Sequence, residues 1–290
     1  MTSSSQKLNS EFKNKTILIT GGSGSIGSAL AEALLQYPVE SIRILDIDEN
    51  SLFKLGRHLD DPKIRLLLGN ITDKDRLNLA AKDVDIIFHT AAIKNIEISE
   101  YNPIETISTN VIGTVNLIQN ALMNKPAKFI NISTDKAVNS STLYGTTKQL
   151  GEKLIAWAGT HILSTKFATI RFGNVFESRG NVLDVWKEEL NNGNPISITD
   201  PSMKRFFFHI SDAANFVMKC IPLVNHGEIF VPKMKSFSIQ ELANSISKNQ
   251  KIIGKRRGEK FEEILISEEE KNFAIEKKDM WIIDSLKINY

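Results

Sequence analysis

The sequence predicts an α/β fold in which a doubly wound parallel sheet is followed by a small C-terminal lobe. Short apolar, β-branched segments alternate with amphipathic helical segments through residues 16–172, which is typical of a parallel sheet with helices on both faces. A glycine-rich loop, TGGSGSIG at residues 20–27, joins the first strand to the first helix. After Phe176 the elements shorten and are separated by Gly-, Asn- and Pro-rich segments. We therefore expect a nucleotide-binding domain over residues 1–172 and a substrate-binding lobe over residues 173–290.

Composition and charge narrow the class of protein. The chain has 290 residues, of which 41% are hydrophobic and 24% charged, so it can fill a sizeable core. Its single cysteine, Cys220, cannot form an internal disulfide, which favours the cytoplasm. A net charge of +2 gives no field to attract nucleic acid, and no segment approaches the roughly 18 apolar residues of a membrane helix. No His, Cys and Asp residues have the spacing of metal ligands, so we expect no metal site.

The individual elements follow from apolar runs and helical spacing. Strands are expected at residues 16–20, 41–46, 64–70, 84–90, 128–134 and 166–175. In the lobe, an apolar helix over residues 211–221 is expected to pack back onto the first domain. The helical stripes expected to be buried are Ile26, Ala29, Leu30, Ala33 and Leu34; Val111, Val115, Ile118 and Leu122; and Leu143, Leu150, Leu154 and Trp157.

The glycine-rich loop predicts a Rossmann-type dinucleotide site. Gly21, Gly24 and Gly27 permit a tight turn and let the backbone approach a pyrophosphate, whose charge is favoured at the N-terminus of the following helix. An ordinary strand-to-helix turn is the alternative, but the position directly between a strand and a helix favours the nucleotide site. The cofactor contacts expected in this loop are Gly21, Ser23, Gly24, Ser25, Ile26 and Gly27.

Asp46, at the end of the second predicted strand, favours NAD as the cofactor. Its carboxylate can accept hydrogen bonds from the ribose hydroxyls of adenosine. The same carboxylate would repel the 2′-phosphate of NADP, and Ile47 is not an arginine that could compensate, so NADP is kept only as an alternative. A turn role is the other interpretation of Asp46. Asn70, after the third strand, is placed either to contact the adenine or to begin a turn.

Tyr144 and Lys148 form the first candidate catalytic pair. They are four residues apart, so on a helix both face the same way. A phenol has a pKa near 10, and a neighbouring ammonium and a nicotinamide cation could lower it enough for base catalysis. A surface tyrosine and lysine on an amphipathic helix are the alternative interpretation. Their place after a buried strand, in a chain with the glycine loop, favours catalysis.

Several motifs together resemble the extended short-chain dehydrogenase/reductase superfamily. Within it the chain is similar to the UDP-N-acetylglucosamine 4,6-dehydratases of polysaccharide biosynthesis. A tyrosine at the head of Tyr-x-x-x-Lys, with the ITDPSMKRF and GEIFVPK segments, resembles the branch that inverts C5. The matching segments are TGGSGSIG (20–27), HTAA (89–92), EYNPIETISTN (100–110), STDKA (133–137), YGTTK (144–148), RFGNV (171–175), ITDPSMKRF (198–206), GEIFVP (227–232) and RRGEK (256–260).

The resemblance implies a lyase with an internal redox cycle on a bound nicotinamide cofactor. Tyr144 would take the proton of the 4-hydroxyl, with Thr134 near the 4-oxygen and Lys148 on the nicotinamide ribose. Lys136 would be the base at C5, and Asp135 the acid that protonates the departing 6-hydroxyl. Taken alone, Asp135 and Lys136 fit a salt-bridged turn better than a catalytic pair, and the surrounding motifs reverse that preference.

The resemblance also implies contacts with a UDP-sugar substrate and with the cofactor. Further cofactor contacts would be Ile71, Ala91, Ala92 and Lys94, and the substrate contacts would be Lys94, Asn174, Arg205, Arg256 and Glu259. For Arg179 a solvated loop is as good an interpretation as a sugar contact. Related enzymes commonly self-associate, so a homo-oligomer is expected.

Three alternatives to the inverting dehydratase stay open. A retaining 4,6-dehydratase and a nucleotide-sugar 4-epimerase are the neighbouring enzymes, and the epimerase needs Tyr144 and Lys148 but no Asp-Lys pair. A redox sensor that binds NAD without catalysis is the non-enzymatic alternative, although such proteins typically lose the Tyr/Lys pair.

Overall fold

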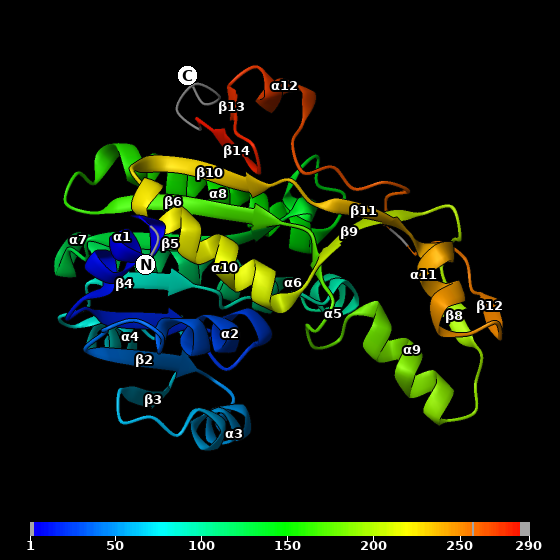
Figure 1. The fold of residues 1–290 in the computed structure, drawn as a ribbon, viewed down its shortest axis with the longest axis horizontal. Helices are drawn as coiled ribbons and strands as arrows, with labels where there is room; N and C mark the ends of the chain where they lie inside the picture. Colours follow the sequence, from blue (N-terminus) through cyan, green and yellow to red (C-terminus); the bar gives the residue numbers. More distant parts are fainter. Residues whose placement is uncertain (1–2, 257, 285–290) are drawn as a thin grey trace.

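The centre of the molecule is a nine-stranded sheet (Figure 1). The computed structural model describes residues 3–256 and 258–284; Arg257 of the RRGEK segment and residues 285–290 of the expected lobe lie outside them. In spatial order the strands are β13 (Ala274–Glu276), β14 (Met280–Ile283), β10 (His226–Pro232), β6 (Lys166–Phe172), β5 (Lys128–Thr134), β4 (Ile86–His89), β1 (Thr16–Thr20), β2 (Ser41–Asp46) and β3 (Ile64–Leu68).

All strands from β10 to β3 pair in parallel, and helices cover both faces, so the predicted α/β class is confirmed. The two faces carry separate apolar cores. One core contains residues from α1 (Ser3–Phe12), α2 (Ser25–Leu34), α3 (Glu49–Leu59) and α10 (Ile210–Cys220). The other contains residues from α4 (Lys74–Ala81), α7 (Gly113–Asn124) and α8 (Leu143–His161). In Figure 1 α2 and α10 lie in front of the sheet and α8 lies behind it.

The smaller part of the fold lies at one end of the sheet, at the right of Figure 1. It has a three-stranded sheet, a two-stranded sheet, and a core centred on Trp186 and Phe207. Its elements are β7 (Asn174–Val175), α9 (Val182–Asn191), β8 (Ile196–Ile198), β9 (Lys204–Phe208), β11 (Lys235–Ser238), α11 (Ile239–Ile246) and β12 (Gln250–Ile252).

The strand expected over residues 166–175 is divided between the two parts. β6 pairs with β5 and β10 in the main sheet, whereas β7 pairs with β9 in the small sheet. The division falls at Gly173, where an added Cβ would lie 2.7 Å from Phe206 Cβ. A single apolar run therefore serves two sheets.

The C-terminal segments do not stay in the lobe. β10, β14 and β13 extend the main sheet beyond β6, so the expected boundary at residue 172 does not separate the two parts along the chain. β10 returns because its buried apolar residues cover the edge of β6, and α10 packs against α2. Along the chain, α12 (Glu268–Lys271) lies between β12 and β13.

Two expected helical stripes are wrong in part. Leu150 and Trp157 of α8 are 43% and 47% exposed, and Leu122 of α7 is 48% exposed. The buried face of α8 consists mainly of small and polar residues, because this face packs over the sheet edge that carries the cleft described below. Three short helical elements connect β4 to α7: α5 (Ile96–Tyr101), α6 (Pro103–Ile107) and a π-helical turn (Ser108–Ile112).

In the described part of the chain, no helix combines the length and apolar character needed to cross a membrane.

Candidate active site

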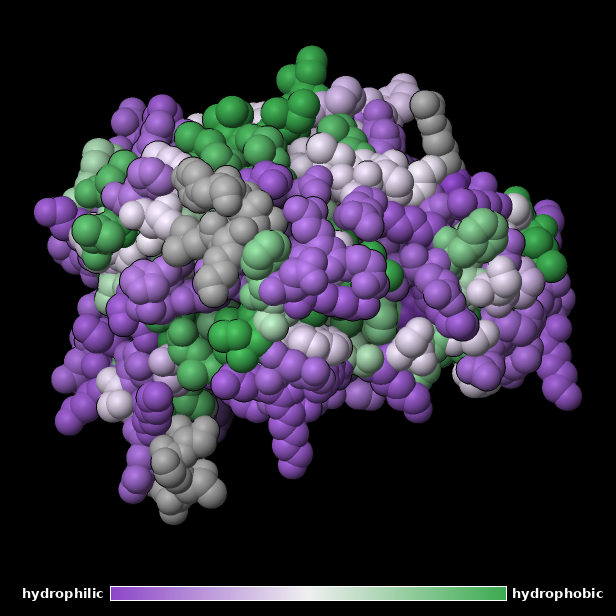
Figure 2. Space-filling view, turned by 90° about the horizontal axis from the view of Figure 1, so that it is seen from above, coloured by the Kyte–Doolittle hydropathy of each residue, from purple (hydrophilic) through white to green (hydrophobic). Residues whose placement is uncertain are grey.

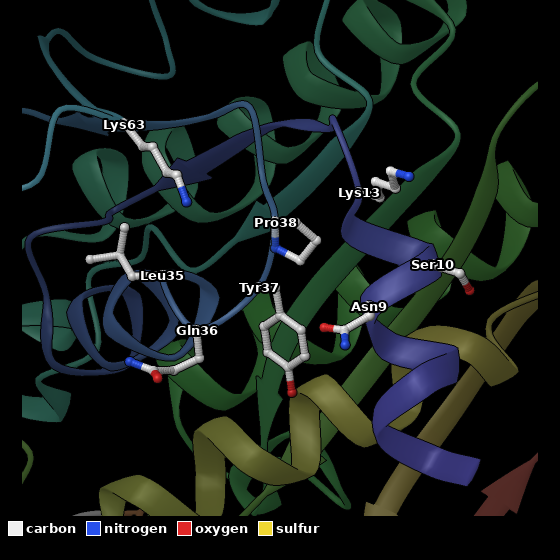
Figure 3. A pocket seen from close by; sticks show the side chains of 8 residues that line it. All are labelled: Asn9, Ser10, Lys13, Leu35, Gln36, Tyr37, Pro38 and Lys63. Atoms are coloured by element: carbon white, nitrogen blue, oxygen red, sulfur yellow. The ribbon is translucent and has the colours of Figure 1, made fainter. Parts of the chain in front are cut away.

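A cleft of about 760 Å³ lies between the carboxyl ends of the central strands and the lobe. This is the edge at which open parallel sheets bind ligands. Its lining includes the glycine loop, the ends of β4 and β5, and lobe residues such as Arg205. A second hollow, beside α1 and Tyr37, is lined by none of the predicted site residues (Figure 3). The larger cleft is therefore the candidate active site.

The glycine loop has the geometry of a pyrophosphate cradle. Gly21 has φ +65°, and a Cβ there would lie 2.5 Å from Ala91 Cα. A Cβ at Gly27 would lie 2.5 Å from Gly22 Cα, so the start of α2 packs tightly on the loop. Gly24 is the N-cap of α2 and leaves this helix terminus without a side-chain cap. Free backbone N–H groups facing a cleft at a helix N-terminus fit a dinucleotide phosphate.

The carboxylate of Asp46 lies at the entrance of this cradle. Its Oδ2 accepts a hydrogen bond from Ser23 N at 3.0 Å, and its Oδ1 accepts one from Asp48 N at 3.2 Å. These two bonds fix the carboxylate at the cleft, where it lies beside the loop. Asn70 also lines the cleft, and its Oδ1 accepts a bond from Thr72 N, so it begins a turn and faces the site at once.

The remaining predicted cofactor residues also line the cleft. Ser23, Ser25, Ile26, Ile71, Ala91, Ala92 and Lys94 are among them. Lys94 Nζ donates to the backbone oxygen of Arg179 at 2.8 Å, and Arg179 N donates to Ser25 Oγ at 2.9 Å. Arg179 thus connects the lobe to the glycine loop, which is more than the solvated loop residue considered from the sequence.

Asp135 and Lys136 lie in a 3₁₀ turn directly after β5. Asp135 is fully buried, and its Oδ1 accepts bonds from Thr134 Oγ1 at 2.9 Å and from Lys136 Nζ at 3.0 Å. Its Oδ2 has no hydrogen-bond partner among the described residues. Lys136 Nζ also lies 3.4 Å from Asn174 Oδ1 of the lobe. The pair is therefore more than a surface turn: it is an ion pair between a fully buried carboxylate, which has one oxygen without a partner in the described part of the chain, and a partly buried lysine that lines the cleft.

Tyr144 lies next to this pair, with its hydroxyl hydrogen-bonded to Thr134. Burial raises the pKa of Tyr144 to about 12; the ammonium of Lys136 opposes this rise, and Asp135 adds to it. The expectation of a lowered phenol pKa is not met by the protein groups alone, because burial outweighs the one ammonium that acts on the ring. That ammonium belongs to Lys136.

Lys148 is buried one turn further along α8. Burial lowers its pKa to about 8, and Glu152 opposes the decrease. Glu152 accepts two bonds from the guanidinium of Arg171, at 2.9 and 2.6 Å, and Arg171 in turn binds Glu270 of α12. This network ties α8, β6 and α12 together behind the cleft.

The residues expected to contact a substrate also line the cleft. Arg205 and Arg256 line the cleft, and the carboxylate of Glu259 accepts a bond from Arg256 N at 2.9 Å. Arg256 Nε also pairs with Glu97 at 3.1 Å. The cleft therefore has arginine side chains on the side opposite the glycine loop, as a ligand with a second phosphate group would require.

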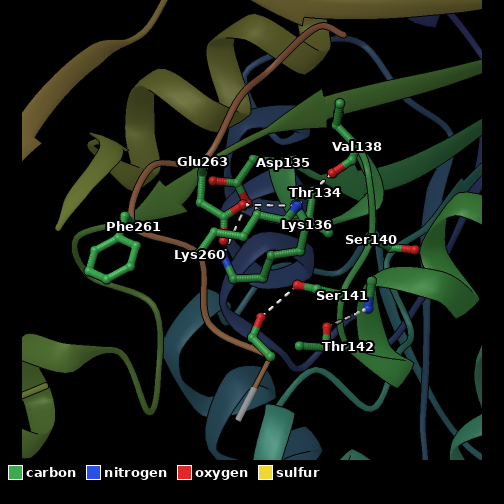
Figure 4. Close-up of polar contacts among 12 residues, drawn as sticks. Thr134, Asp135, Lys136, Val138, Ser140, Ser141, Thr142, Lys260, Phe261 and Glu263 are labelled. Atoms are coloured by element: carbon green, nitrogen blue, oxygen red, sulfur yellow. Dashed lines mark hydrogen bonds and ion pairs between the residues drawn. The ribbon is translucent and has the colours of Figure 1, made fainter. Parts of the chain in front are cut away.

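Lys260 and Glu263 are among the cleft residues that were not singled out from the sequence. Both lie in the segment 258–266, which crosses the cleft (Figure 4). Lys260 was visible only as part of the RRGEK motif, and nothing in the periodicity marks Glu263 as buried. Across residues 3–256 and 258–284, no group of three or more His, Cys, Asp or Glu residues has the geometry to hold a metal ion.

Residues 17–285 match the family described as "Polysaccharide biosynthesis protein". The chain belongs to this family. The match covers the main sheet, the cleft and the segments that return from the lobe to the sheet.

Three relatives and one solved structure illustrate its similarities. An uncharacterized membrane protein of Methanocaldococcus jannaschii is 43% identical, over 96% of this chain and 88% of the relative. The inverting UDP-N-acetylglucosamine 4,6-dehydratase of Campylobacter jejuni is 39% identical, over 94% and 83%. A UDP-glucose 4-epimerase of Rickettsia bellii is 38% identical, over 89% and 80%. The X-ray structure of Pen from Bacillus thuringiensis superposes with a TM-score of 0.90 at 34% identity, covering 94% of this chain and 88% of that one.

Proposed function

We propose that this protein is a C5-inverting 4,6-dehydratase that converts UDP-N-acetylglucosamine into a UDP-4-keto-6-deoxy-hexosamine. The observation that carries the proposal is the Asp135–Lys136 ion pair: Lys136 lines the cleft together with Tyr144 and Lys148, and the buried Asp135 lies directly behind it. Elimination across C5–C6 needs a base that removes the C5 proton and an acid that protonates the hydroxyl leaving C6. Two adjacent residues in one turn can supply both groups at the required spacing. A relative of this name at 39% identity supports the same activity.

The cofactor proposed for the cradle is NAD, held by the glycine loop and by Asp46, with Lys148 at the nicotinamide ribose. When bound, NAD accepts a hydride from the sugar and returns it. Asp46 selects a free ribose hydroxyl over a 2′-phosphate, because two anionic groups in contact repel.

The chain's own residues handle the protons. Tyr144 takes the proton of the 4-hydroxyl, and Thr134 fixes the phenol by a hydrogen bond. Burial raises the pKa of Tyr144, and a positively charged cofactor held in the cleft would favour its deprotonated form. Lys136 takes the C5 proton, and Asp135 protonates the departing 6-hydroxyl through the carboxylate that carries the uncommitted oxygen.

The lobe is proposed to hold the UDP moiety. Arg205 and Arg256 would bind phosphate oxygens through their planar guanidinium groups, Asn174 and Glu259 would contact the nucleotide part, and Lys94 would lie where substrate and cofactor meet.

A 4-epimerase is the second candidate, because a relative at 38% identity carries that name. An epimerase would use Tyr144 and Lys148 in the same way, but its chemistry does not use a buried acid beside a lysine. A retaining dehydratase would use the acid and base without inverting C5, and an NAD-binding sensor would need none of these groups.

The test is proton NMR of UDP-N-acetylglucosamine incubated with the NAD-loaded enzyme in D₂O. We expect loss of the 6-hydroxyl, deuterium at C5 and the coupling constants of an L-configured ring. Lys136→Ala should reduce dehydration by about 10²–10⁴-fold, whereas Lys166→Ala, an exposed lysine at the start of β6, should leave it unchanged. Appearance of the galacto isomer without dehydration would show an epimerase, and an unchanged C5 would show the retaining reaction.

We also propose that the protein acts in the cytoplasm as a homo-oligomer. The outward faces of α7 and α8 are apolar: Leu122, Met123, Leu150 and Trp157 are 43–62% exposed. Figure 2 shows hydrophobic residues along the upper edge of the view, the side on which α8 covers the sheet. Two neighbouring helices with apolar faces suit pairing with a second copy about a two-fold axis.

A further inference from the structure

Glu263 is a buried carboxylate in the cleft that the proposed chemistry does not use. Its side chain is 6% exposed, and its Oε2 has no hydrogen-bond partner in the part of the chain that the structure describes. The nearest cation is the ammonium of Lys260, whose Nζ lies 3.5 Å from Oε2. Burying a carboxylate with one cation at 3.5 Å and no hydrogen bond to Oε2 from any described residue costs folding free energy, which suggests a functional role for this residue.

The position of Glu263 is fixed by tethers on the segment 258–266. Ser141 Oγ donates to Gly258 O at 2.6 Å, and Lys260 Nζ donates to Val138 O at 2.6 Å. Further along, Arg171 Nη1 donates to Leu265 O at 3.0 Å. The segment is therefore held at both ends against the turn and the strand that flank Asp135 and Lys136.

The side chain of Glu263 points from this segment toward Asp135 and Lys136 (Figure 4). The charged and titratable groups around Lys136 are Asp135 in its own turn, Glu263 and its partner Lys260 on the crossing segment, Tyr144 of α8 and Lys94 after β4. Burial lowers the pKa of Lys136, but Asp135 and then Glu263 raise it, and the net result lies above its ordinary value.

We propose that Glu263 is a positioning residue for Lys136, placing from the crossing segment the second negative charge of a partly buried four-charge cluster with Asp135, Lys136 and Lys260. The charges of the cluster sum to zero, which makes its burial tolerable. The proton of Lys136 can pass to Asp135 Oδ1 across 3.0 Å, leaving a neutral amine and a protonated acid. Beside the Glu263 charge, that amine is a stronger base toward a C–H proton.

The role of Lys136 as a base at C5 rests on the proposed function, whereas the effect of the Glu263 charge on the pKa of Lys136 does not. The first measurement is therefore a titration of the NAD-loaded protein labelled with ¹³Cε-lysine, with the Lys136 signal assigned from Lys136→Gln. Glu263→Gln should lower the pKa of Lys136 by about one pH unit. Glu263→Asp, which keeps the charge, should restore most of it.

Two further variants make this titration decisive. Glu262→Gln is the matched control, because the neighbouring Glu262 is 59% exposed and pairs with Lys204 at the surface, so Lys136 should not respond. Lys260→Gln removes the opposing cation and should raise the pKa of Lys136. An unchanged pKa in Glu263→Gln, or a decrease in Lys260→Gln, overturns the inference. The Lys260 variant still decides if Glu263→Gln fails to fold.

Activity supplies the second measurement. Glu263→Gln should lower kcat for dehydration about tenfold and leave KM within about twofold, because the charge acts on the proton transfer rather than on substrate binding. A loss confined to KM overturns the positioning role. If the pKa of Lys136 shifts as expected but the wild-type protein dehydrates no UDP-sugar, the proposed function has failed and the charge assignment stands.

Discussion

His89 shows how a single side chain can be fixed entirely by its neighbours. It is fully buried at the end of β4; its Nδ1 lies 2.8 Å from Thr20 Oγ1, and its Nε2 lies 3.0 Å from Thr114 Oγ1. Burial, and then the charge of Lys148, lower the pKa of His89 to about 3. The ring joins β1, β4 and α7 as a neutral group.

This neutrality predicts a pH-dependent stability. Below pH 6.5 the unfolded chain protonates His89 while the folded protein does not, so the free energy of unfolding falls as pH decreases toward 3. Between pH 6.5 and 4, this difference in protonation of His89 lowers the free energy of unfolding by about 3 kcal/mol. Urea unfolding should show a flatter acid limb for His89→Gln than for the wild type. Parallel limbs would contradict the assignment.

At the scale of one element, the glycines of α8 are not equivalent. A Cβ at Gly145 would collide with the backbone oxygen of Lys136, whereas a Cβ at Gly151 would meet nothing within 4 Å. Both glycines lie in the same helix, on its buried side. Gly145 thus lets α8 approach the turn that carries Asp135 and Lys136.

Alanine at these two positions should therefore have opposite effects. Gly145→Ala pushes α8 away from the turn, and we expect a loss of about 2 kcal/mol in unfolding free energy with a large loss of activity. Gly151→Ala should gain about 0.5–1 kcal/mol from the lower entropy of the unfolded chain. Thermal unfolding of both variants measures the contrast, and equal effects would show that the close approach is unimportant.

The sequence predicted this helix but not which face it buries. Its stripe of large apolar residues faces outward, because the inward face needs small residues for close packing and polar residues for the cleft. The apolar run at 166–175 likewise predicted one strand, since periodicity does not reveal that Gly173 divides it between two sheets. Patterns that serve binding or chemistry depart from the packing rules used to interpret them.

At the scale of the whole molecule, the cleft is formed by segments far apart in sequence. The glycine loop, Tyr144 and Lys148 could be identified from local motifs, because the loop joins a strand to a helix and the pair lies one helical turn apart. Asp135 and Lys136 were identified only through the family resemblance, because alone they fit a salt-bridged turn. Glu263 could not be identified, because its burial depends on how the segment 258–266 crosses the cleft. Local spacing carries no information on such a crossing.

Self-association is the prediction that belongs to this scale. Trp157→Glu and Leu150→Glu place charges on the outward face of α8, and we expect each to shift the protein toward the monomer in sedimentation equilibrium. Ile252→Glu is the matched control, since Ile252 is 66% exposed on β12 at the far end of the lobe. Identical masses for all variants would place the interface elsewhere.

The division of one strand at Gly173 has a mechanical consequence. Residue 172 belongs to the main sheet and residue 174 to the lobe, so the lobe is joined to β6 through a single residue. That residue lies against Asp135: a Cβ on Gly173 would be 3.2 Å from Asp135 Oδ2. Asn174, the first lobe residue after it, lies with its Oδ1 3.4 Å from Lys136 Nζ. The Asp135–Lys136 pair therefore contacts both parts of the molecule at one junction, and a displacement of the lobe there would alter the geometry of the pair.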